Sequence, residues 1–311
     1  MSPGTERLAA VSVDLDEIPC YAAIYGIEPP RESAHAIYDH ALDRLLRVFD
    51  DERVRATFFA IGSDLGRAEN AIALRAASNA GHEVASHSMS HLYDLVRRDR
   101  ATIEREIDEA HDAIERAVGK APVGFRAPGY TISDTVFDVL ESRGYEYDSS
   151  VFPCPPYYAA KAAAIGAIAA RGRTSRSIVD DPRVLAAPAD PYRVGRPYWH
   201  HGRGLRELPI GVTRGARLPY IGTTVVMAGE RGARLLTRGI VGRPVVSLEL
   251  HGIDLSDAEA DGLEWLRPHQ QDLKRTAKEK EAALRAALGA LRDAGYRFVT
   301  CAQAADAQAV G

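Results

Sequence analysis

The sequence predicts an α/β protein in which a parallel sheet closes into a barrel. Short apolar stretches with the alternation of strands recur between longer amphipathic stretches with helical periodicity. Consecutive β-α units of this kind build parallel sheets, and a chain of 311 residues, 46% of them hydrophobic, can bury the core of a barrel. We expect one barrel domain over residues 1–311, with a long irregular basic insertion or lid at 152–243 before the last strands.

The predicted elements alternate regularly up to residue 151. Runs rich in apolar residues predict strands at 10–15, 56–61, 82–86, 123–126 and 145–148. Amphipathic stretches predict helices at 33–49, which begins with the capping residue Ser33, and at 64–79, 100–118 and 133–143. Pro, Gly and Arg then interrupt the pattern, which resumes with a strand at 245–250, a helix at 270–294 and a strand at 297–300.

Cysteine usage and hydropathy predict a cytoplasmic location. Cys20, Cys154 and Cys301 are odd in number and have no metal-type spacing, which favours free thiols in a reducing compartment. The first ten residues contain no apolar stretch of signal-peptide length, and no run reaches the ~18 apolar residues that a membrane span needs. We therefore expect no transmembrane segment.

The net charge of −4 is unevenly distributed. Residues 152–246 contain 15 Lys and Arg against 5 Asp and Glu, a balance of +10 that includes the group Arg171, Arg173 and Arg176. Such a block indicates either an anionic partner, for example a phosphate, a nucleotide or an acidic lipid face, or a solvated arginine-rich loop. Nucleic acid is not expected, because dense basic clusters interleaved with stacking aromatics are missing from this block.

Polar residues gather at the ends of the predicted strands, where the chemistry of α/β barrels lies. In the first strand, Asp14 and Asp16 share one face because strand side chains alternate, so both carboxylates would point into the barrel mouth. Two like charges this close need a cation nearby.

Two histidines follow the third predicted strand. His87 and His91 have a common zinc-ligand spacing, and we expect both imidazoles on one face of a helical turn. Two neutral imidazoles and one carboxylate make a three-ligand site with open positions, as in catalytic metal sites.

The motifs together resemble one family. Their order is Asp14-Leu15-Asp16, Thr57-Phe58-Phe59, GHEVASHSMSH at 81–91, FRAPGY at 125–130, YDSSVFP at 147–153 and LHGID at 250–254. This order is similar to that of the NodB-type polysaccharide deacetylases of carbohydrate esterase family four. The resemblance covers residues 11–151 well, residues 245 to the end moderately, and the basic segment loosely.

The resemblance implies a distorted (β/α) barrel of the NodB homology type and a divalent metal, most often Zn²⁺, with Co²⁺, Ni²⁺ or Fe²⁺ as alternatives. It also implies Asp16, His87 and His91 as metal ligands and Asp14 as general base. The chain departs from the common pattern, because Leu15 separates the two aspartates and no Asp-Trp motif follows YDSS.

Three further residues complete the expected chemistry. Arg126 can hold the base ionised and oriented, and a backbone N–H at Gly129 could stabilise an oxyanion. His251, on the strand face of Ser247 and Glu249, would protonate the departing amine. Asp148 and Asp254 are candidate partners for His251, although Asp148 could instead cap the turn into Ser149-Ser150.

Substrate contacts are expected from aromatic residues. Tyr130 would line the cleft or pack in the core, and Trp199 in the basic segment would stack on a sugar or an acyl chain, or pack.

The sequence therefore predicts a metal-dependent hydrolase that removes an N-acyl group, most plausibly acetyl, from an amino sugar or sugar-containing metabolite. A cytoplasmic location and the basic segment favour a small, nucleotide-linked or lipid-linked substrate that can be anionic. The alternatives are an amide or ureide hydrolase of the allantoinase or deformylase type on the same barrel, and a catalytically silent carbohydrate-binding protein. No oligomeric state is predicted.

Overall fold

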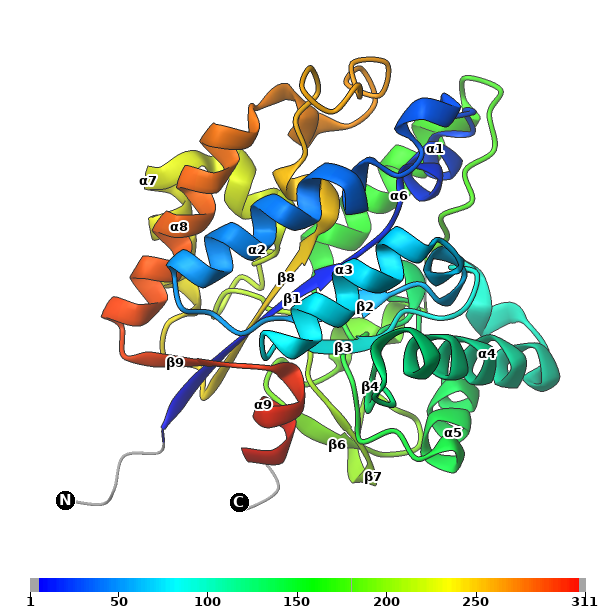
Figure 1. Cartoon of the computed structure of the whole chain (residues 1–311). Coiled ribbons are helices and arrows are strands. Elements are labelled where there is room, and N and C mark those ends of the chain that lie inside the picture. Colours follow the sequence, from blue (N-terminus) through cyan, green and yellow to red (C-terminus); the bar gives the residue numbers. More distant parts are fainter. Residues whose placement is uncertain (1–5, 180, 308–311) are drawn as a thin grey trace.

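One curved sheet organises the chain, which is described here by a computed structural model for residues 6–179 and 181–307 (Figure 1). Its strand order is β6-β7-β5-β4-β3-β2-β1-β8, and β9 pairs with the first half of β1. All neighbours are parallel except β6 and β7. The strands are β1 (Arg7–Asp14), β2 (Thr57–Ala60), β3 (Glu83–Ser86), β4 (Gly124–Phe125), β5 (Tyr147–Asp148), β6 (Tyr192–Val194), β7 (His201–Glu207), β8 (Val245–His251) and β9 (Tyr296–Val299). The predicted distorted (β/α) barrel is confirmed.

Helices surround the sheet, and neighbours such as α3 and α4 or α7 and α8 pack against each other (Figure 1). They are α1 (Ile18–Tyr25), α2 (Leu42–Asp51), α3 (Ala68–Asn79), α4 (Arg100–Val118), α5 (Asp134–Arg143), α6 (Pro155–Ala169), α7 (Gly222–Ile240), α8 (Ala277–Asp293) and α9 (Cys301–Ala307). No helix among the residues described is both long and apolar enough to cross a membrane.

Strand β1 is the axis of the fold. It pairs with β8 along one edge and with β2 and β9 along the other, so it is buried on both faces and reads as a nearly continuous apolar run. In this register Asp14 lies opposite Phe59 of β2 and His251 of β8. The end of β1 is therefore surrounded by the ends of its neighbours.

Three predicted helices begin later than expected. Helix α3 begins at Ala68 rather than 64, after a 3₁₀ turn at Gly62–Gly66. Instead of one helix from Ser33, a 3₁₀ turn at Arg31–Ser33 and a π-helical turn at Ile37–Ala41 precede α2, and the Ile37 N–H donates to the Glu17 carboxylate. Helix α8 begins at Ala277 rather than 270, because Thr276 and Glu279 form a reciprocal capping box.

The segment 152–243 is more regular than its sequence indicates. It contains α6, β6, β7 and all of α7, and β7 extends the sheet beside β5. Helix α6 is alanine-rich, and only Tyr158 and Ile168 on it are buried. The role of this segment as an insertion or lid stays a prediction. Residues 1–5, 180 and 308–311 of the predicted domain lie outside the described part. The first five of the ten residues on which the signal-peptide expectation rests are among them.

One buried histidine makes stability depend on pH. The His82 Nδ1 accepts a hydrogen bond from the Ala56 N–H at 3.1 Å, and burial together with the nearby Arg55 lowers its pKa to about 4. Between the ordinary pKa of about 6.5 and this value, the unfolded chain binds a proton that the folded protein does not. The free energy of unfolding should therefore fall as pH decreases through this window.

We expect His82→Asn, whose Oδ1 can replace the Nδ1 acceptor without titrating, to make this fall smaller by about 1–2 kcal/mol, allowing for solvent near the ring. Urea unfolding at pH 7 and pH 4.5 measures it, with exposed His40→Asn as the control. An unchanged pH dependence in His82→Asn would contradict the assignment.

Candidate active site

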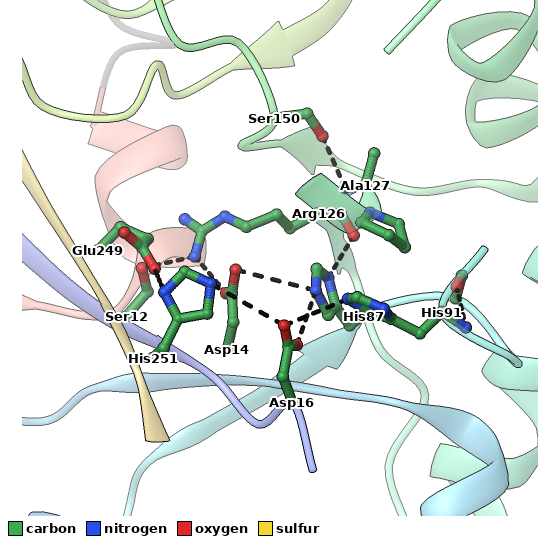
Figure 2. Close-up of polar contacts among 12 residues, drawn as sticks. Ser12, Asp14, Asp16, His87, His91, Arg126, Ala127, Ser150, Glu249 and His251 are labelled. Carbon is green, nitrogen blue, oxygen red and sulfur yellow. Dashed lines mark hydrogen bonds and ion pairs between the residues drawn. The ribbon is translucent and has the colours of Figure 1, made fainter. Parts of the chain in front are cut away.

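The candidate residues gather at the C-terminal ends of four strands (Figure 2). Asp14 ends β1 and Asp16 follows it, His87 follows β3, Arg126 follows β4, and His251 ends β8. Strand pairing brings these ends together, because β1 lies beside β8 and reaches β4 through β2 and β3. These polar residues therefore lie at the C-terminal ends of the strands, where the sequence predicts them.

Asp16, His87 and His91 form a compact triad. His87 Nε2 lies 3.2 Å from Asp16 Oδ1, and His91 Nε2 lies 3.3 Å from Asp16 Oδ2. One potential ligand atom from each residue falls within 4.8 Å of the others, and all three side chains are buried. A carboxylate with two imidazoles is a common donor set for zinc.

The loop that carries the two histidines is not the helical turn that the spacing indicates. Residues 87–91 have no helical structure, and Ser88 and His91 adopt left-handed backbone conformations with φ of 64° and 52°. Such values are unfavourable for residues with a Cβ, so the surroundings must hold them. The Ser90 N–H donates to Glu106 of α4, and the His91 N–H donates to the Ser88 hydroxyl. Backbone hydrogen bonds rather than helix periodicity aim the second imidazole.

The triad has atoms that the described protein groups do not satisfy. Asp16 Oδ1 and both ring nitrogens of His91 are buried without a hydrogen bond of suitable geometry within the residues described, although the ionic contacts above are short. Burial alone would raise the pKa of Asp16, but the two imidazoles hold it well below its usual value. His87 Nδ1 lies 2.7 Å from the carbonyl oxygen of Arg126, so Nδ1 carries the proton and Nε2 is directed at Asp16. These features fit a metal ion.

Arg126 and Asp14 form a fully buried ion pair. Arg126 Nη1 donates to Asp14 Oδ1 at 2.6 Å and to the Ser12 hydroxyl at 3.0 Å, while Nε donates to the Ser149 carbonyl at 2.8 Å. Burial opposes the charge, but Asp14 and Glu249 raise the pKa of the guanidinium. Asp14 Oδ2 has no hydrogen bond among the described residues.

The predicted partners of His251 are both corrected by the structure. Its Nδ1 contacts Glu249 Oε1 at 2.9 Å, two residues earlier on the same face of β8. Asp254 instead accepts the backbone N–H of His251 at 2.8 Å, and Asp148 accepts the N–H and hydroxyl of Ser150, the turn-capping alternative. Burial lowers the pKa of His251, yet Glu249, Asp16 and Asp14 outweigh it and raise that pKa well above its usual value.

Glu249 is thus the residue that the sequence analysis missed. The signal was present, because its position two residues before His251 places both side chains on one face of the strand. Asp14, Glu249 and His251 also offer atoms within 4.8 Å of one another, so they form a second cluster beside the triad.

A cavity of about 490 Å³ opens beside these clusters. Asp16, His251, Gly129 and Tyr130 line it, so the last two lie where the sequence predicts substrate contacts. Gly129 has a φ of 62°, a conformation that favours glycine. Tyr130 packs edge-on against His251, with ring centroids 6.0 Å apart.

Trp199 does not belong to this cavity. It packs against Tyr198 and beneath the Arg183 guanidinium, away from the lining residues. The basic group is also divided, since Arg171 and Arg173 line one separate cavity and Arg176 another. Although Arg171, Arg173 and Arg176 are close in the sequence, they do not line one common cavity.

Part of the chain is similar to known proteins. A family model described as polysaccharide deacetylase matches residues 35–147. A peptidoglycan deacetylase of Helicobacter pylori is 29% identical over 161 residues, which cover 49% of this chain and 53% of that protein. A peptidoglycan-N-acetylglucosamine deacetylase of Bacillus cereus is 31% identical over 144 residues, covering 46% and 56% respectively. The chain thus spans about half the length of these curated relatives.

A structure comparison extends the likeness beyond the matched segment. A solved structure from Mycobacterium smegmatis, whose name places it with the polysaccharide deacetylases, superposes with a TM-score of 0.61. It covers 100% of this chain and 93% of its own at 20% identity, a level that supports the fold alone. Residues 35–147 thus match the polysaccharide deacetylase family model, and the whole chain shares the fold of the Mycobacterium smegmatis structure.

Proposed function

We propose that the protein is a metal-dependent N-deacetylase that acts on an amino sugar or a sugar-containing metabolite. The observation that carries this proposal is the pairing of two clusters at one edge of the sheet. Asp16, His87 and His91 make a cation site, and Asp14 and His251 stand beside it, each held by a buried partner of opposite charge. A protein that only binds carbohydrate would need neither a base such as Asp14 nor an acid such as His251, which argues against the catalytically silent alternative.

The triad would hold a divalent metal, most plausibly Zn²⁺ given its nitrogen and oxygen donors. When bound, such an ion polarises a carbonyl group and makes hydroxide accessible near neutral pH. The second ring nitrogen of His87 faces the Arg126 carbonyl, which fixes the orientation of this imidazole.

Asp14 is proposed as the general base. Arg126 occupies its Oδ1, which fixes the orientation of the carboxylate and leaves Oδ2 to accept a proton from a water molecule at the site. Because Arg126 also binds Ser12 and Ser149, the carboxylate has little freedom to turn away.

His251 is proposed as the general acid. Glu249 binds Nδ1, so Nε2, which lies 3.9 Å from Asp16 Oδ2, faces the space where the scissile amide would sit. A proton on Nε2 can then pass to the departing amine. Glu249 acts through His251 and is a positioning residue.

The proposed substrate is an amide on an amino sugar, as expected from the relatives in Helicobacter pylori and Bacillus cereus, which are peptidoglycan deacetylases. Linkage to a nucleotide or lipid, an anionic character and a cytoplasmic location stay predictions. The ureide-hydrolase alternative is less favoured because the chain retains a full Asp and two-His set. A panel of N-acetyl sugars and cyclic amides separates the two.

Removal of a metal ligand should abolish both metal binding and turnover. We expect His91→Ala and Asp16→Ala to lose bound zinc and at least about 100-fold of activity, because two remaining donors hold a cation weakly. Elemental analysis and acetate release from N-acetylglucosamine oligosaccharides measure the two effects, with His40→Ala as the control. A chelator-stripped wild-type protein that stays fully active would refute metal dependence.

Loss of the base should separate chemistry from metal binding. Asp14→Asn is expected to retain the metal, since Asp14 is outside the triad, while kcat falls by about 10²- to 10⁴-fold. Metal content and kcat are measured on the same preparation. Loss of the metal together with activity would mean that Asp14 is a ligand.

The Glu249 contact makes a third prediction. Glu249→Gln should lower kcat by about 100-fold with little change in KM, because His251 loses its orienting charge while substrate contacts remain. The alkaline limb of the kcat profile should also move to lower pH, since Glu249 raises the pKa of His251. Ser247→Ala, one position earlier on this strand face, is the control. An unmoved alkaline limb would show that Glu249 is only structural.

A further inference from the structure

The cavity beside the two clusters has largely apolar walls. Helices α1, α6 and α7 and the turn after β8 build it. Its lining is dominated by aromatic and aliphatic side chains, namely Tyr21, Ile24, Tyr25, Tyr93, Tyr157, Met227 and Ile253. At about 490 Å³ it lies within the range of small-molecule pockets.

Two hydrogen-bond donors interrupt this apolar surface near the reacting groups. The hydroxyls of Tyr21 and Tyr130 are buried and have no hydrogen-bond partner within the described residues, and both rings lie edge-on to His251. Burial raises the pKa of both phenols well above the usual value, so both hydroxyls stay protonated. A buried hydroxyl without a partner is costly, which points to a ligand that supplies acceptors there.

The cavity does not continue as a groove across the site. The Tyr93 hydroxyl donates to the Cys20 carbonyl at 3.2 Å, which joins the 87–95 loop to α1. A second, more polar cavity lies beyond this contact. Tyr93 is the one residue, among those described, that lines both cavities. A polymer laid across the metal triad would meet this wall.

From these observations we propose that the substrate carries an apolar substituent, larger than a methyl group, close to the scissile amide, and that this cavity binds it. The inference rests on the proposed function and narrows its substrate class to compact, partly apolar amides. An internal unit of a glycan would place many hydroxyls against this largely apolar lining. The phenols of Tyr21 and Tyr130 are buried donors without a partner there, but they cannot pair with all of these hydroxyls. Polar groups that are buried without a partner oppose binding. The substituent could be an acyl chain or a group on the amine side, and both share this chemistry.

Binding of two ligand series to the metal-loaded 311-residue chain tests the proposal. One series lengthens the acyl group of N-acylglucosamine from acetyl to octanoyl, and the other lengthens the alkyl group of N-acetylglucosamine glycosides from methyl to octyl. In an Asp14→Asn background, which blocks turnover, calorimetry should show affinity rising by up to about fourfold per methylene in one series. The series that responds identifies the side of the amide.

A matched pair of variants on α6 assigns the effect to the cavity. Ala160 lines the cavity and Ala163 on the same helix does not, although both are exposed to solvent. Ala160→Trp should remove the chain-length dependence, whereas Ala163→Trp should retain it as in the parent.

Affinity independent of chain length in both series would overturn the inference, as would equal gains in the two tryptophan variants. Because binding is measured without turnover, either result is distinct from failure of the proposed function. That failure would appear as a wild-type protein that binds these ligands but hydrolyses no amide.

Discussion

The buried Arg126 side chain is the interaction on which the rest of the site depends. A guanidinium without solvent contact is tolerated only when its donors are paired, and here Asp14, Ser12 and Ser149 receive them. These partners come from β1 and from the turn after β5, so one side chain connects three strand ends. Its backbone carbonyl also faces His87, which links the proposed base to a proposed metal ligand.

Charge is therefore balanced around the site in two separate groups. The imidazoles of the triad surround one carboxylate, while Asp14 and Glu249 flank Arg126 and His251. Two aspartates two residues apart are accommodated because each faces a different cation or prospective cation. Alternation along β1 and β8 makes this division possible, since side chains two positions apart share a face.

Local patterns predicted the parts of the site that end or closely follow strands. The alternation in VSVDLD indicated Asp14 and Asp16, and the motif order indicated His87, His91, Arg126 and His251. The helical turn at 87–91 was wrong because hydrogen bonds from a distant helix decide that backbone. Trp199 packs beneath Arg183, the alternative left open by its sequence, and the three arginines line two different cavities, which their spacing in the sequence does not indicate. The strand period was enough to place Glu249 on the same face as His251. Its contact with the His251 imidazole could be recognised only from the distance between the side chains.

Substitutions on helix α6 can change the cavity without moving the residues of the two clusters. It contributes walls to the cavity but none of the residues of the two clusters, and most of its surface is exposed alanine. Alanines of this kind accept larger side chains without disturbing a core. Substrate range can therefore diverge through single substitutions on one helix while the atoms that carry out the reaction keep their positions.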